Sequence, residues 1–137
     1  SRPVKLEGKR LLDGGVSDPI PVKWMLSRGY EKNVVVLTRD VKYRKKANPK
    51  MQLFLKAVLH KYPAFLKDLE ERHIHYNETL EELAALEKEG RVHIIRPSSP
   101  IQAAMIERDE SNLERIYQTG RADMKKDLEK LKAYLDS

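Results

Sequence analysis

Residues 33–39 read Asn-Val-Val-Val-Leu-Thr-Arg (NVVVLTR), and this stretch decides the class of fold. An apolar, β-branched run without alternation is typical of a strand that is buried on both faces, as in a parallel sheet. A second run of this kind, RVHIIRP, occupies residues 91–97 and follows Gly90. The two runs predict strands that pair in parallel and are joined by helices.

The segments around these strands predict a β-hairpin and a set of helices. Residues 4–12 predict the hairpin, with its turn around residues 7–9. Helical patterns occupy residues 22–28, 51–62, 66–89 and 113–135, and a glycine follows the first and the third. With the second hairpin strand, three parallel strands are expected. The predicted fold is α/β: a partial three-layer sandwich of few, mostly parallel strands, with an N-terminal β-hairpin and a helical C-terminal part.

Composition limits the functions that the chain can have. The 137 residues include no cysteine, which excludes disulfides, a thiol nucleophile and a cysteine metal site. No apolar run approaches the roughly 18 residues that a membrane span needs. The N-terminal residues do not resemble a signal peptide, so we expect a cytoplasmic protein. We expect neither a metal nor a cofactor.

The net charge of +6 is concentrated in one segment. Residues 39–50, RDVKYRKKANPK, hold six basic residues against one acidic residue, which gives +5. Clustered Lys and Arg side chains are attracted to anionic lipid surfaces, and the alternative interpretation is a solvated loop. The candidate anion-binding residues are Arg39, Lys42, Arg44, Lys45 and Lys46.

Asp13 is the candidate catalytic residue, within RLLDGGVSDPIP at residues 10–21. It follows a predicted strand directly, and ligands of open α/β sheets bind beyond the carboxyl ends of strands. Gly14 and Gly15 are expected to adopt positive φ and to let other groups approach closely. The carboxylate could activate a nucleophile, or it could simply bond to the backbone of a tight turn.

The stretch L-L-D-G-G-V-S-D-P-I-P-V, residues 11–22, resembles the aspartate motif of patatin-like phospholipases. The upstream P-V-K-L-E-G-K-R and the downstream Y-R-K-K, E-R-H-x-x-Y-N-E-T-L and K-E-G-R-V-H-I-I-R-P stretches are also similar to bacterial members of that family. The resemblance implies a serine–aspartate dyad that hydrolyses acyl esters of lipids. It assigns Asp13 as the dyad aspartate, with Gly14 and Gly15 completing the motif. It further implies that residues 1–48 end a catalytic domain and that residues 49–137 form a C-terminal extension.

The nucleophile of that dyad is missing, because no G-x-S-x-G occurs in the 137 residues. Ser17 lies only four residues after Asp13, so we interpret it as a turn residue. We therefore expect the serine in a missing N-terminal part of the same protein, and we expect this chain to be inactive alone. The expected partners are that N-terminal part, a lipid or ester substrate, a membrane surface and further copies of the chain. No nucleic-acid partner is expected, although the alternative function is a non-catalytic module that binds anionic lipid or nucleic acid through residues 39–50.

The four histidines offer weaker candidates. His73 and His75 are two residues apart on a predicted helix and should point to different faces, which does not suit a metal pair. His60 and His93 have no partner motif, and His93 is expected to be packed in its strand. The loop at residues 98–100 follows that strand and could line a site.

Overall fold

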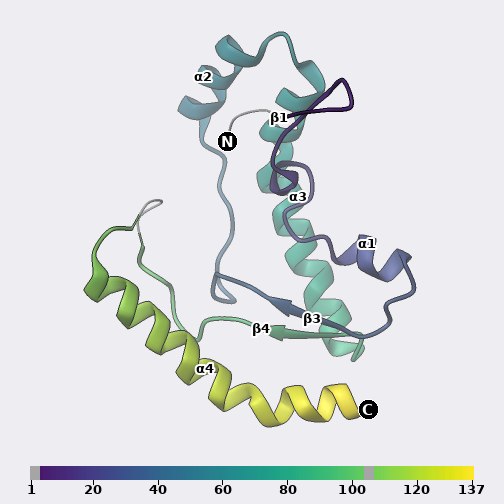
Figure 1. The fold of residues 1–137 in the computed structure, drawn as a ribbon, viewed down its shortest axis with the longest axis vertical. Coiled ribbons are helices and arrows are strands. Elements are labelled where there is room, and N and C mark those ends of the chain that lie inside the picture. Colours follow the sequence, from purple (N-terminus) through teal and green to yellow (C-terminus); the bar gives the residue numbers. More distant parts are fainter. Residues whose placement is uncertain (1–3, 104–106) are drawn as a thin grey trace. The chain divides into compact units, whose positions relative to one another are not determined.

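The computed structural model describes residues 4–103 and 107–137 of the chain (Figure 1). Pro3, the first residue of the P-V-K-L-E-G-K-R stretch, lies outside these residues. The chain forms two compact units, one from residues 1–21 and 44–82 and the other from residues 22–43 and 83–137. The proposed division at residue 48 concerns a longer protein and stays a prediction.

The first unit contains the N-terminal hairpin and most of the central helices. β1 (Val4–Leu6) pairs antiparallel with β2 (Lys9–Leu11), as the sequence predicts. Glu7 and Gly8 both have positive φ, the geometry of the tight turns that join twisted strands. A short 3-10 helix, Gly14–Val16, follows β2.

Two proline-started helices complete that unit. α2 (Pro49–Leu59) begins where the Asn48 side chain accepts a hydrogen bond from the Met51 N–H at 3.1 Å. α3 (Pro63–Lys88) restarts the helical path at the next proline, because proline suits the first turn of a helix and not its interior. Residues of α3 up to Glu82 belong to this unit, and the rest of the helix belongs to the other.

The second unit is built on a small parallel sheet. α1 (Val22–Ser27) leads into β3 (Asn33–Val36), which pairs in parallel with β4 (Val92–Ile95), as predicted (Figure 1). α4 (Glu110–Asp136) packs against β4. Gly29 and Gly90 have positive φ and end α1 and α3 with the paired backbone bonds of a helix C-cap. The fold is therefore a mixed α/β arrangement.

Two expectations about the strands were wrong. β2 pairs with β1 and does not join β3 and β4, so the described residues form two two-stranded sheets. β3 is not buried on both faces, because Val34 is 42% and Val36 is 69% exposed. Periodicity identifies a strand, but the partners that cover it are set by tertiary contacts. Within residues 4–103 and 107–137, no helix is long and apolar enough to cross a membrane.

Candidate functional site around Asp13

Asp13 lies on the surface just beyond the end of β2 and caps the 3-10 helix. Its Oδ1 atom accepts a hydrogen bond from the Gly15 N–H at 2.9 Å. This is the backbone contact expected of a tight turn. Oδ2 receives no hydrogen bond from the described part of the chain. One carboxylate oxygen is therefore held in place, and the other is available to a further donor.

The two glycines act differently from the expectation. Neither Gly14 nor Gly15 has positive φ, so the predicted left-handed turn was wrong. A short 3-10 helix makes the turn with ordinary φ values instead. A Cβ atom on Gly15 would lie 3.2 Å from Asp13 Oδ1, so the carboxylate would have to shift by a few tenths of an ångström to admit it. A Cβ atom on Gly14 would meet nothing within 4 Å.

The Asp13 turn opens on a cavity of about 280 Å³ in the first unit. Apolar side chains form much of its wall, among them Leu11, Val16, Leu59 and Phe65. Arg10 and Tyr62 add polar groups, and the Arg10 Nη1 donates to the Tyr62 hydroxyl at 2.5 Å. An apolar cavity with a few polar groups at its edge is the usual form of a small-molecule site.

Ser17 also lies at this cavity, and its environment identifies it as a turn residue. Its hydroxyl donates to the Gly14 carbonyl oxygen at 3.3 Å, and its backbone N–H contributes to the same cap. The interpretation of Ser17 as a local turn residue is confirmed. A hydroxyl used in this way is not activated by the carboxylate four residues earlier.

Helix α3 anchors two loops of the first unit through the E-R-H-x-x-Y-N-E-T-L stretch. The Arg72 Nε donates to the Gly15 carbonyl oxygen at 3.0 Å, which fixes the Asp13 turn. Five residues later on the same helix, the Asn77 amide makes two hydrogen bonds with the backbone of Lys45. Its Oδ1 accepts from the Lys45 N–H at 2.8 Å, and its Nδ2 donates to the Lys45 carbonyl at 3.0 Å. Sequence reasoning assigned no role to Arg72 or Asn77, because only the fold brings them to residues 15 and 45.

Lys45 is the candidate anion-binding residue with the most distinct environment. Its Nζ lies 5.3 Å from the centre of the Tyr76 ring. Partial burial of the side chain, and secondly the nearby Arg72 guanidinium, hold the pKa of Lys45 below its ordinary value. The Arg72 guanidinium, which bonds to the Asp13 turn, therefore lies near the Lys45 ammonium group.

The remaining basic residues do not form one continuous patch within a unit. Arg39 and Lys42 belong to the second unit, whereas Arg44, Lys45 and Lys46 belong to the first. The Arg39 guanidinium lies 5.1 Å from the centre of the Tyr43 ring. Residues 40–43 and the loop at 98–100 share a cavity of about 410 Å³ at the carboxyl ends of β3 and β4. Anion binding by the five basic residues stays a prediction.

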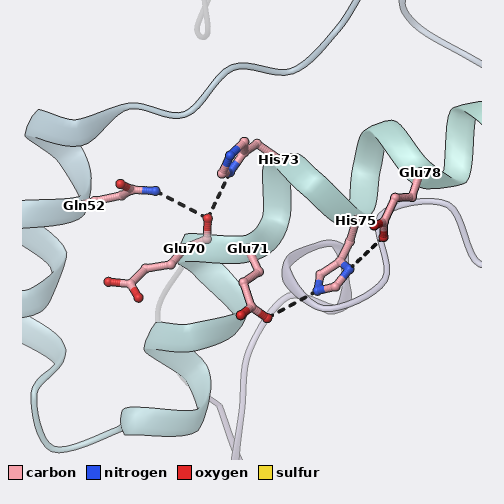
Figure 2. A network of polar contacts seen from close by, with 6 residues as sticks. All are labelled: Gln52, Glu70, Glu71, His73, His75 and Glu78. Carbon is pink, nitrogen blue, oxygen red and sulfur yellow. Dashed lines mark hydrogen bonds and ion pairs between the residues drawn. The ribbon is translucent and has the colours of Figure 1, made fainter.

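His73 and His75 point in different directions on α3 (Figure 2). The His73 Nδ1–H donates to the Glu70 carbonyl oxygen at 2.9 Å, an oxygen that also accepts from the Gln52 amide at 3.4 Å. His75 lies between Glu71 and Glu78, with ring nitrogens 3.5 and 3.3 Å from their carboxylates. No group of three or more metal-ligating side chains occurs in the described part of the chain.

The second unit contains another polar cluster, which the sequence did not predict. The His93 Nε2–H donates to Asp127 Oδ2 at 2.5 Å, because a carboxylate can only accept. The His93 ring lies 5.5 Å from the Tyr134 ring, centre to centre. The Tyr134 hydroxyl accepts from the Asn33 N–H at 2.8 Å and donates to the Arg91 carbonyl at 2.9 Å. These contacts attach α4 to both strands of the parallel sheet, which is a structural role.

The fold and site define a mixed α/β protein with an oriented surface carboxylate beside an apolar cavity. Residues 62–136 match the family described as "Domain of unknown function (DUF6363)". The match covers 75 of the 137 residues, and the chain belongs to this family. The comparisons with curated proteins and with solved structures gave no match. Tyr62, Arg72 and Asn77, which bond to Arg10, Gly15 and Lys45 respectively, all lie within the matched segment.

Proposed function

We propose that this chain is the C-terminal portion of a patatin-like lipid acyl hydrolase and that Asp13 is the acid/base residue of its serine–aspartate dyad. The serine would lie in an N-terminal part of the same protein, since the 137 residues contain no G-x-S-x-G. The proposal rests on the L-L-D-G-G-V-S-D-P-I-P-V stretch together with the geometry of Asp13.

The orientation of the Asp13 carboxylate is the observation that carries the proposal. Oδ1 is held at 2.9 Å from the Gly15 nitrogen, while Oδ2 has no donor among the described residues. A general base must lie within hydrogen-bond reach of the proton that it removes. An exposed oxygen on a fixed carboxylate meets this requirement for a hydroxyl brought by another segment.

In the proposed reaction, Asp13 Oδ2 accepts the serine proton while the serine oxygen attacks the acyl carbon of the ester. The protonated carboxyl group then returns that proton to the leaving alcohol. Water hydrolyses the acyl-serine by the same route, and Asp13 is again the base. This chemistry needs neither a metal nor a cofactor. The apolar wall of the Asp13 cavity suits the lipid part of such a substrate.

The parallel sheet supports the finer proposal of a three-layer sandwich. Parallel sheets are normally covered on both faces and contain more than two strands. Here β3 has one parallel neighbour, β4, and exposes Val34 and Val36. We propose that strands of the N-terminal part extend this sheet and cover the exposed side chains. The protein would act in the cytoplasm, with the basic residues of 39–50 at an anionic membrane surface.

The test is Asp13→Asn in the full-length protein, meaning this chain together with its N-terminal part. Asparagine keeps the shape of the side chain and cannot accept the serine proton. Hydrolysis of p-nitrophenyl acyl esters should fall about 10²- to 10⁴-fold, the usual contribution of a general base. Asp18→Asn, in the same loop but outside the cavity, is the matched control and should retain activity. Normal hydrolysis by the Asp13→Asn protein, or by the 137-residue chain alone, would contradict the proposal.

A further inference from the structure

Two arginine hydrogen bonds flank Asp13 along the chain. Arg10, three residues before it, donates to the Tyr62 hydroxyl at 2.5 Å. Arg72 donates from Nε to the carbonyl oxygen of Gly15, two residues after Asp13, at 3.0 Å. Tyr62 and Arg72 belong to the segment that matches the family, whereas Asp13 lies outside it. The family domain thus holds the candidate catalytic loop from both sides.

We propose that Arg72 is a positioning residue for Asp13: its guanidinium fixes Gly15, and Gly15 in turn fixes the carboxylate. The proposal rests on the function proposed above and adds a role for the family domain. Arg72 does not touch the substrate or the reacting atoms. It acts by restricting the backbone motion of the turn that carries Asp13, so that Oδ2 keeps one position.

The hydrogen bonds around Gly15 show how that restraint works. The Gly15 N–H donates to Asp13 Oδ1, while the Gly15 carbonyl accepts from Arg72. A carbonyl bond to a charged donor is stronger than one to a neutral donor. Both polar groups of this one residue are engaged, so Gly15 cannot rotate without breaking a bond. The Asp13 carboxylate then keeps one orientation instead of several.

Hydrogen bonds to the Gly14 carbonyl strengthen the hydrogen bond from the Gly15 N–H to the Asp13 carboxylate. The Gly14 carbonyl, in the same peptide unit as the Gly15 N–H, accepts from the Asp18 N–H at 2.9 Å and from the Ser17 hydroxyl at 3.3 Å. A peptide whose carbonyl accepts hydrogen bonds becomes a better N–H donor. These bonds depend on the same turn that Arg72 holds.

The space around Gly15 agrees with this arrangement. An added Cβ atom would lie 3.2 Å from Asp13 Oδ1 and 4.0 Å from Arg72 Nη2. The carboxylate and the guanidinium therefore approach the same side of residue 15, and the carboxylate lies closer than a Cβ atom normally allows. A residue with a side chain at position 15 would therefore crowd the carboxylate that the Gly15 N–H holds.

The experiment compares four forms of the full-length protein with wild type: Asp13→Asn, Arg72→Gln, Arg72→Lys and the control Arg115→Gln. Arg115 lies on α4 and bonds to Asn112 within that helix, so it provides the same substitution in the other unit. Ester hydrolysis gives kcat and KM for each form. Amide hydrogen exchange at Val16 and Asp18, whose N–H groups bond within the turn, reports how firmly the turn is held.

We expect Arg72→Gln to lower kcat about tenfold or more, because a small misplacement of a catalytic group has effects of this size. KM should change less than about twofold, since uniform substrate binding is not affected. Exchange at Val16 and Asp18 should become about tenfold faster. Arg72→Lys keeps a charged donor and should recover part of kcat, whereas Arg115→Gln should match wild type.

The outcomes separate this proposal from the proposed function. If Asp13→Asn is inactive while Arg72→Gln keeps the wild-type kcat, the dyad stands and the role of Arg72 is overturned. If Arg72→Gln merely reduces the folded fraction, the loss of kcat disappears after correction for folded protein, and the positioning role is again overturned. If Asp13→Asn is fully active, both proposals fall together.

Discussion

At Lys45, the surroundings disfavour the charge of the side chain. Partial burial, and then the Arg72 guanidinium, lower its pKa from the ordinary 10.5. In the pH range between the lowered pKa and 10.5, the unfolded chain binds more protons than the folded chain. The contribution of Lys45 to stability therefore rises with pH across that range, and its charge is unfavourable below it.

We predict that Lys45→Met raises Tm at pH 7, because methionine keeps an apolar stem beside Tyr76 and removes the charge. The rise should be small, on the order of one degree, since Lys45 is partly exposed and its charge is screened. The gain over wild type should shrink as the pH approaches 10.5. Thermal melts between pH 7 and 10.5 measure the difference in Tm between Lys45→Met and wild type. Lys46→Met, at an exposed neighbour, is the control. A gain that is constant with pH would contradict the role of charge.

At the scale of elements, Tyr134 fastens α4 to the parallel sheet. Its hydroxyl accepts a hydrogen bond from the N–H of Asn33 on β3 and donates one to the carbonyl of Arg91, just before β4. Asn33 is 8% exposed, so its N–H has little access to water when that partner is removed. Buried polar groups left without a partner are costly.

We predict that Tyr134→Phe lowers the free energy of unfolding by about 1–3 kcal/mol, the cost of leaving a buried polar group unpaired. Urea denaturation of the chain measures this loss. Tyr117→Phe removes a hydroxyl from a side chain of the same helix that is 58% exposed, and it should change stability little. Equal effects of the two substitutions would mean that the hydroxyl of Tyr134 does not hold α4 to the strands.

The elements that the sequence predicted correctly are those with local causes. Gly29 and Gly90 end helices because glycine adopts positive φ. The contacts that the sequence did not predict join residues that are far apart in the chain. Arg72 lies 57 residues from Gly15, and Tyr134 lies 101 residues from Asn33. No local pattern marks either pair.

The candidate site was predictable in part for the same reason. The hydrogen bond of Asp13 to the backbone two residues on is local, and the sequence anticipated it as one of two readings. The cavity beside it was not anticipated, because its wall combines β2 with residues of α2 and α3. The predicted positive φ at the two glycines failed because a 3-10 helix provides the turn with ordinary backbone angles.

At the scale of the whole molecule, few apolar side chains are shielded from water. In the described part of the chain the buried apolar residues are Val22, Leu83, Val92 and Ile94, all in the second unit. Among the residues that the structure describes, nineteen large apolar or aromatic side chains are exposed, including Leu53 and Phe54 of α2. A domain of about 150 residues normally buries roughly 70% of the surface of its unfolded chain. These exposed side chains are the ones that the proposed N-terminal part would cover.

We predict that the isolated chain unfolds with weak cooperativity, because unfolding exposes little additional apolar surface. Its urea m-value should lie near the low end of the roughly 1–3 kcal/mol/M seen for small proteins, and it should bind the dye ANS. The full-length protein should show a steeper transition and little dye binding, since its N-terminal part would cover the exposed side chains. If further copies of the chain provided the cover instead, Tm of the isolated chain would rise with its concentration. A steep transition without dye binding, independent of concentration, would contradict the proposed N-terminal cover.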